Sequence, residues 1–227
     1  MLTHLLGWMA AALSILLTWP QIWLSCVKGR TLGLSATACW LSFALNVCWF
    51  TYGVLLRDPV QVATNLVCGA GNAAILASLL THQPSLRARR ALAATGWGAA
   101  LLALSASTAA GATGVTGVTG AQAAAALGAV ISGIGIFSYF PQVVSLLRDR
   151  TQDLSGMSPA RWWLATGSST LWTSYGFLQG QPAVWALSGF GLACNLTVCY
   201  LLTTSRRTVP AAAPALSQRP VELALAA

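Results

Sequence analysis

Apolar residues dominate the chain in long runs, and short polar or basic segments separate these runs. A helix crosses the hydrocarbon core of a bilayer with about 20 residues. Seven runs reach that length: residues 5–27, 34–56, 59–81, 91–111, 121–147, 159–178 and 182–204. The pattern predicts an all-α integral membrane protein with seven transmembrane helices.

Two parts of the chain repeat one another. The step Pro20-Gln21 in the first run is matched by Pro141-Gln142 in the fifth. Further matches pair Arg30-Thr31 with Arg150-Thr151, Trp49 with Trp172, Tyr52 with Tyr175, Pro59 with Pro182, and Asn72 with Asn195. Matches in register over this length indicate two copies of one three-helix unit.

The repeat sets the domain organisation. We expect a first unit over residues 1–83, a linker with one helix and an outer loop over 84–120, and a second unit over 121–204. One extra crossing lets the second unit begin on the same side as the first, so this 3+1+3 arrangement makes the units parallel. The short loop after the first helix predicts that helices 1 and 2 are neighbours. Residues 205–227, rich in Ala and Pro, are expected to be a disordered tail.

Each Pro-Gln step predicts a hinge. Proline removes one backbone hydrogen bond inside a helix and bends it. The adjacent glutamine can satisfy the carbonyl that loses its partner, or contact a neighbouring helix. Pro20, Gln21, Pro141 and Gln142 are therefore the candidate hinge residues.

Charge indicates the orientation. The chain is 56% hydrophobic and 7% charged, with a mean hydropathy of +0.68 and a net charge of +8. Eleven of the 12 Lys and Arg residues fall in or near the first, third and fifth connections or in the tail, and Arg57 alone lies on the other side. We expect the protein to lie in the cell membrane. The positive-inside rule then places its N-terminus outside the cell and its C-terminus in the cytoplasm. The positive net charge is thus explained by the orientation of the helices in a lipid bilayer, and we expect no nucleic-acid partner.

Acidic and metal-binding residues are sparse. The acidic residues Asp58, Asp149, Asp153 and Glu222 all fall in predicted loops or the tail, and the six cysteines show no metal or disulfide spacing. No carboxylate is expected inside a span, where a proton relay would need one. This favours passive movement of a neutral solute without a cofactor or metal. No nucleophile and base cluster at any depth, so an enzyme is not expected.

Helical rise places a candidate pocket. At ~1.5 Å per residue, Trp49 and Asn65 lie roughly 10 Å below the outer ends of their helices. Trp172 and Ser188 share that depth in the second unit, and Asn72 and Asn195 lie one layer deeper. Indole walls with amides and hydroxyls between them suit a sugar. The alternative is that the tryptophans belong to interfacial belts and the asparagines join helices.

Together these residues resemble PQ-loop repeat transporters and, among them, the SWEET sugar facilitators, over residues 5–204. The resemblance implies parallel repeats. It also implies a pocket at Trp49, Asn65 and Trp172, although Ser188 stands where that family repeats the asparagine. Tyr52, Arg57 and Asp58 resemble the outer gate of the one-unit bacterial relatives, and Tyr175 is the second copy of Tyr52.

The leading hypothesis is a passive uniporter for a mono- or disaccharide that works by alternating access. The alternatives are a cystinosin-like, proton-coupled amino-acid exporter, and a receptor or scaffold on the same fold. The sequence leaves open the solute, the direction of flux and whether the protein forms a homo-oligomer.

Overall fold

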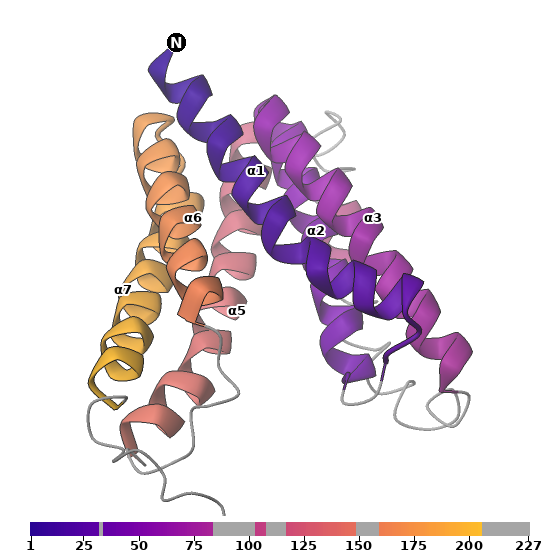
Figure 1. Cartoon of the computed structure of the whole chain (residues 1–227). Coiled ribbons are helices and arrows are strands. Elements are labelled where there is room, and N and C mark those ends of the chain that lie inside the picture. Colours follow the sequence, from indigo (N-terminus) through magenta and orange to yellow (C-terminus); the bar gives the residue numbers. More distant parts are fainter. Residues whose placement is uncertain (32–33, 84–102, 108–116, 149–158, 206–227) are drawn as a thin grey trace, which may run out of the picture.

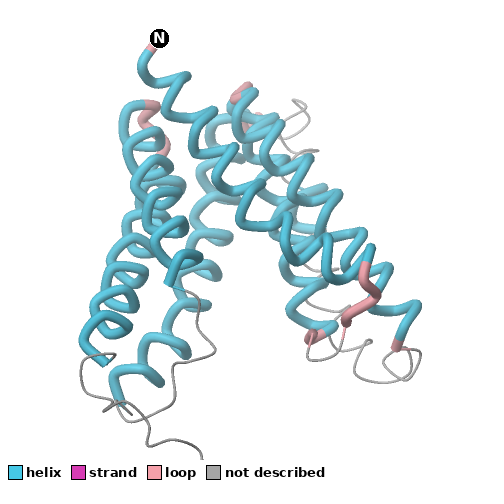
Figure 2. Tube along the Cα trace, in the orientation of Figure 1, coloured by secondary structure: helices cyan, strands magenta, loops and turns pink. Residues whose placement is uncertain are grey.

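The regular structure is helical throughout the part of the chain that the structure describes. The computed structural model describes residues 1–31, 34–83, 103–107, 117–148 and 159–205. Within these ranges the elements are α1 (Leu2–Ile22), a π-helical turn η1 (Trp23–Val27), α2 (Ala36–Leu56), α3 (Pro59–His82), α5 (Gly120–Arg148), α6 (Pro159–Leu178) and α7 (Pro182–Ser205) (Figures 1 and 2). Each lies within a few residues of a predicted span.

Five of the described helical segments are long and apolar enough to cross a membrane: Leu2–Val27, Ala36–Leu56, Pro59–His82, Gly120–Phe140 and Pro182–Thr204. The chain is therefore a multi-pass helical membrane protein in a lipid bilayer. The α6 helix has the right length, 20 residues, but carries several Ser and Thr residues that lower its hydropathy. The predicted fourth span, 91–111, and the tail, 205–227, lie almost entirely outside the described residues.

Helix contacts divide the chain into two groups. α3 packs against both α1 and α2, and α7 packs against both α5 and α6. The groups meet where α1 contacts α6 and where α2 contacts α5. Exchanging α1, α2 and α3 for α5, α6 and α7 reproduces this set of contacts, as expected for two copies of one unit.

The expectation that helices 1 and 2 are neighbours is wrong, because α3 lies between them. Two glycines of α3 admit a helix on each side. A Cβ on Gly71 would lie 2.5 Å from Ile22 Cδ1 of α1, and one on Gly69 would lie 3.3 Å from Asn46 Cβ of α2. The short loop limits how far apart α1 and α2 can be, but it does not require them to touch.

The two groups converge at one end of the molecule. In Figure 1 the helices approach one another at the end that carries the N-terminus and diverge at the other end. We call these the closed end and the open end. At the closed end, α2 and α6 finish in equivalent left-handed residues, Arg57 with φ 55° and Gly180 with φ 64°. Asp58 then caps α3, because its Oδ1 accepts hydrogen bonds from the backbone N–H groups of Val60 and Gln61.

Two tyrosines on glycines close this end. Tyr52 of α2 packs on Gly128 of α5, and Tyr175 of α6 packs on Gly7 of α1. A Cβ on either glycine would lie within 2.8 Å of the tyrosine ring. Each glycine precedes the proline of its helix by 13 residues, so the two contacts are equivalent in the repeat.

Pro20 lies inside α1, and the π-helical turn η1 begins three residues later. Gln21 Nε2 of α1 donates a hydrogen bond to Ser25 Oγ of η1 at 2.9 Å. Ser78 Oγ of α3 donates to the Ser25 carbonyl at 2.6 Å. The end of α1 is therefore fastened to α3. Pro141 and Gln142 lie within α5, but their side chains are outside the described part of the structure.

Candidate functional site: a cavity between the two units

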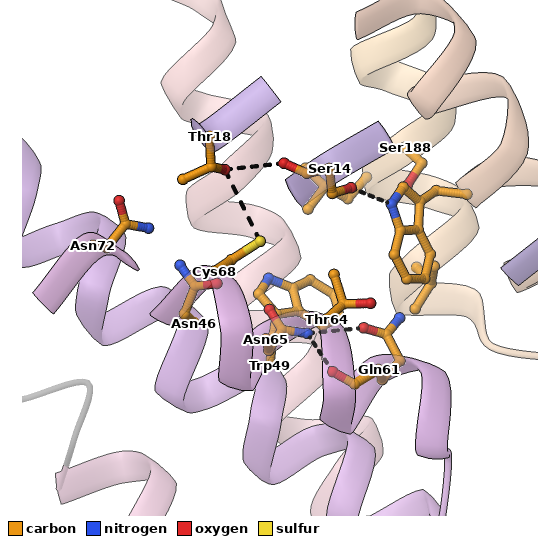
Figure 3. A pocket seen from close by; sticks show the side chains of 13 residues that line it. Ser14, Thr18, Asn46, Trp49, Gln61, Thr64, Asn65, Cys68, Asn72 and Ser188 are labelled. Atoms are coloured by element: carbon orange, nitrogen blue, oxygen red, sulfur yellow. Dashed lines mark hydrogen bonds between the residues drawn. The ribbon is translucent and has the colours of Figure 1, made fainter. Parts of the chain in front are cut away.

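A cavity of about 290 Å³ lies between the two groups of helices. It follows α3 from Gln61 to Asn72, which are eleven helical steps or roughly 16 Å apart. Its walls come from α1, α2, α3, α6 and α7, and its lining residues are Ser14, Thr18, Asn46, Trp49, Gln61, Thr64, Asn65, Cys68, Asn72, Trp172, Val184, Leu187 and Ser188 (Figure 3). None of these residues is charged.

Both candidate tryptophans line the cavity, and each is braced by the tyrosine one turn further along its helix. Trp49 meets Tyr52 edge to face at 5.2 Å between ring centroids, and Trp172 meets Tyr175 at 5.7 Å in the same way. Because these tyrosines also rest on the glycines of the closed end, the indoles are held in place by the contacts that close the molecule.

Amide groups gather on one wall. Asn65 Nδ2 donates to the carbonyl of Gln61 at 2.9 Å and to Gln61 Oε1 at 3.1 Å, as Figure 3 shows. Asn46 Nδ2 donates to the Ser42 carbonyl at 2.7 Å. The amide oxygens of Asn46 and Asn65 and the amide nitrogen of Gln61 have no hydrogen-bond partner among the described residues. This wall therefore offers both donors and acceptors to an occupant.

Five of the six predicted binding residues meet at this cavity: Trp49, Asn65, Asn72, Trp172 and Ser188. Asn195 is placed elsewhere. It is buried, and its Nδ2 donates to Ser169 Oγ of α6 at 3.0 Å, away from the cavity lining. The side chain thus joins α7 to α6.

Sequence reasoning missed a polar stripe. Gln61, Thr64 and Cys68 share one face of α3 with Asn65 and Asn72, at the spacing of successive helical turns. Extending the stripe from the two asparagines would have found them. Ser14 and Thr18, four residues apart on α1, carry a similar but weaker signal.

The predicted outer gate is brought together only in part. Asp58 is 5% exposed, although the sequence predicts that it lies in a loop. Tyr175 donates its hydroxyl to Asp58 Oδ1 at 2.7 Å, and Gln181 Nε2 donates to Oδ2 at 2.7 Å. The carboxyl group therefore links the α2–α3 turn to the second unit. Gln181 Oε1 is buried and has no hydrogen-bond partner among the described residues.

The other two gate residues are placed differently. Arg57 is exposed and forms no ion pair within the described ranges. Its left-handed backbone corresponds to Gly180 of the second unit, so the position requires a conformation more than a charge. Tyr52 is buried on Gly128 and does not share a hydrogen bond with Asp58 in this arrangement.

Fold and site define a helical membrane protein with two equivalent groups of helices around an uncharged polar cavity. Residues 2–62 match the family model of the PQ loop repeat. The fold is similar to the 3.7 Å resolution structure of a eukaryotic SWEET transporter, with a TM-score of 0.68 and 15% sequence identity over 91% of this chain and 100% of that chain. No curated protein matches the chain. Residues 2–62 are thus similar to a PQ loop repeat, and the chain as a whole shares the fold of that transporter.

Proposed function

We propose that the protein is a passive uniporter that moves a small neutral solute, a mono- or disaccharide, across the cell membrane by alternating access. The observation that carries this proposal is the cavity, where Trp49 and Trp172 occupy equivalent places in the two units and amide groups lie beside them.

The lining chemistry supports a sugar. The C–H faces of a sugar ring stack on indole, and its hydroxyls need both donors and acceptors. The lining supplies these from Asn46, Gln61 and Asn65 and carries no charged side chain. A cationic or anionic solute would be taken out of water without a counter-charge, which is unfavourable.

The shape supports alternating access with the open end in the cytoplasm. The closed end is held by Asp58 and by the two tyrosines on glycines, whereas the helices diverge at the other end (Figure 1). Lys28, Arg30, Arg148 and Arg161 lie at helix ends on the open side, and Arg57 lies at the closed end. The positive-inside rule places that open side in the cytoplasm. In this proposal Pro20 and Pro141, with Gln21 and Gln142, are the hinges of a 3+1+3 protein.

One observation favours the proton-coupled amino-acid alternative. Asp58 is a buried carboxyl group that joins the two units, and a proton-coupled carrier would need a carboxyl group inside the protein. It lies at the closed end and is not part of the cavity lining. We therefore place it in the closure and not in solute binding.

The experiment is uptake of radiolabelled sugars and amino acids into proteoliposomes, with protein-free vesicles as the blank. We expect saturable sugar uptake that a protonophore leaves unchanged. Asn65→Ala should weaken the apparent affinity about fivefold, since one lost hydrogen bond costs ~1 kcal/mol. The matched control on the same helix is Thr81→Ala, whose hydroxyl bonds the Ala77 carbonyl and no other group among the described residues. Amino-acid uptake that collapses with the proton gradient, or full sugar uptake by Asn65→Ala, would contradict the proposal.

A further inference from the structure

The two tryptophans of the cavity differ in their hydrogen bonding. Trp172 Nε1 donates to Ser14 Oγ of α1 at 2.9 Å. The equivalent of Ser14 in the second unit is Gly135, because each lies six residues before the proline of its helix. Gly135 has no hydroxyl to offer Trp49. The indole N–H of Trp49 has no partner among the described residues, so it is available to an occupant.

The α3 and α7 walls also differ. Gln61, Thr64 and Asn65 of α3 correspond to Val184, Leu187 and Ser188 of α7, counted from Pro59 and Pro182. All six residues line the cavity. Two polar side chains of the first unit are thus replaced by two aliphatic ones, and only Ser188 keeps a polar group on that wall.

Large side chains of the second unit fill space on its side, so the cavity lies closer to the first unit. Leu187 fills the space beside Gly135, where an added Cβ would lie 2.7 Å from Leu187 Cδ1. Tyr139 fills the space beside Gly191 in the same way, at 2.7 Å from its hydroxyl. Their counterparts in the first unit are the smaller pairs Thr64 with Ser14 and Thr18 with Cys68. Nine of the 13 lining residues accordingly come from the first unit.

These differences give the cavity one polar side and one apolar side. A hydroxyl pressed against Val184 and Leu187 would lose its water and find no partner, whereas a C–H or methyl group there would gain contact. The volume of about 290 Å³ is at the lower end of the ~300–1,000 Å³ typical of ligand pockets, which suits a single sugar ring.

We propose that the cavity selects a monosaccharide with one edge that lacks a hydroxyl, of which a 6-deoxyhexose is the simplest form. Its hydroxyls face Gln61, Asn65 and the Trp49 N–H, and its apolar edge rests on Val184 and Leu187. This proposal rests on the sugar transport proposed above and narrows its substrate class.

The test compares uptake of matched sugars that differ by one hydroxyl: D-glucose with 6-deoxy-D-glucose, and D-galactose with D-fucose. The wild-type protein should prefer at least one deoxy sugar about tenfold in kcat/KM, the size of effect that one such group has in an apolar pocket. Val184→Gln and Leu187→Thr place the first unit's residues in the second and should each reduce this preference severalfold. Leu196→Thr, on an exposed face of α7, is the matched control and should leave it unchanged.

The outcomes separate this proposal from the one on which it rests. Hexose uptake with no preference for either deoxy sugar would overturn the proposal and leave sugar transport standing. The same holds for a deoxy preference that both Val184→Gln and Leu187→Thr leave intact. Absence of any sugar uptake would overturn the proposed function itself. The wild-type ratio needs no variant, so the test holds even if a substituted protein fails to fold.

Discussion

At the residue scale, the closed end is asymmetric where the sequence repeat suggests symmetry. Asp58 and Gln181 occupy equivalent positions after α2 and α6, and each unit contributes one tyrosine. Only Tyr175 donates its hydroxyl to the carboxyl group of Asp58. Only one of the two tyrosine hydroxyls therefore helps to fasten the closure, together with the hydrogen bond from Gln181 Nε2 to Asp58 Oδ2, while both tyrosine rings pack on glycine.

This asymmetry predicts unequal effects of two like substitutions. Tyr175→Phe keeps the ring on Gly7 but removes a hydrogen bond to a carboxyl group, worth about 1–2 kcal/mol. It should favour opening of the closed end, so that a cysteine at position 61 reacts roughly tenfold faster with a membrane-impermeant thiol reagent added from outside. Tyr52→Phe is the matched control and should change the rate little. Equal rates of thiol labelling in the two variants would show that the hydrogen bond from Tyr175 to Asp58 does not hold the closed end.

The sequence predicted whether a single side chain reaches the cavity where the depth of the residue in its helix is sufficient to decide this. It did not do so where the outcome depends on which helix packs against the residue. Trp49 and Trp172 are deep and in register, and both reach the cavity. Asn195 has the same repeat signal, but its amide turns to Ser169 of α6. Helical periodicity assigns a side chain to a stripe, but it does not say which neighbouring helix that stripe meets.

At the element scale, α1 combines a bend with a fixed end. Pro20 removes a backbone hydrogen bond within the helix, and η1 widens the turn that follows. Ser78 ties that turn to α3, and Gln83 Nε2 donates to the Thr31 carbonyl at 2.7 Å just beyond it. We infer that the open-end part of α1 moves together with α3, with the bend at Pro20 absorbing the motion.

This arrangement predicts that Pro20→Ala slows transport. Alanine restores the missing backbone N–H and straightens the helix, so exchange of sugar across vesicles should slow severalfold, while thermal stability is kept or raised. The matched control is Pro182→Ala. Pro182 begins α7, where no helical hydrogen bond needs its N–H. A normal exchange rate in Pro20→Ala would show that the bend is structural and not a hinge.

Element boundaries followed from the apolar runs and from Pro59 and Pro182, which begin helices as proline at the first helical position does. The sequence did not predict which helices pack against one another. Gly69 and Gly71 decide that α3 enters between α1 and α2, and glycine in an apolar run gives no sign of which helix will approach it.

At the scale of the whole molecule, two equivalent sets of helix contacts enclose a cavity that is not equivalent on its two sides. The sequence repeat predicted the two units because matched motifs fold alike. Which end is closed was not predictable, since the two states of the proposed alternating-access cycle would share one sequence and differ in free energy by only a few kcal/mol. The displacement of the cavity follows from paired changes of size, such as Thr18 with Cys68 against Tyr139 with Gly191.

Solute protection shows whether the transported sugar binds in this cavity. Cysteines are placed singly at positions 65 and 188 in a background that lacks the six native cysteines and still transports, and a small thiol reagent is applied with and without sugar. A cysteine at position 57, exposed at the α2–α3 turn, is the control. We expect a saturating concentration of sugar to slow labelling at positions 65 and 188 by fivefold or more and to leave the labelling of position 57 unchanged. Equal labelling with and without sugar at both cavity positions would contradict this expectation.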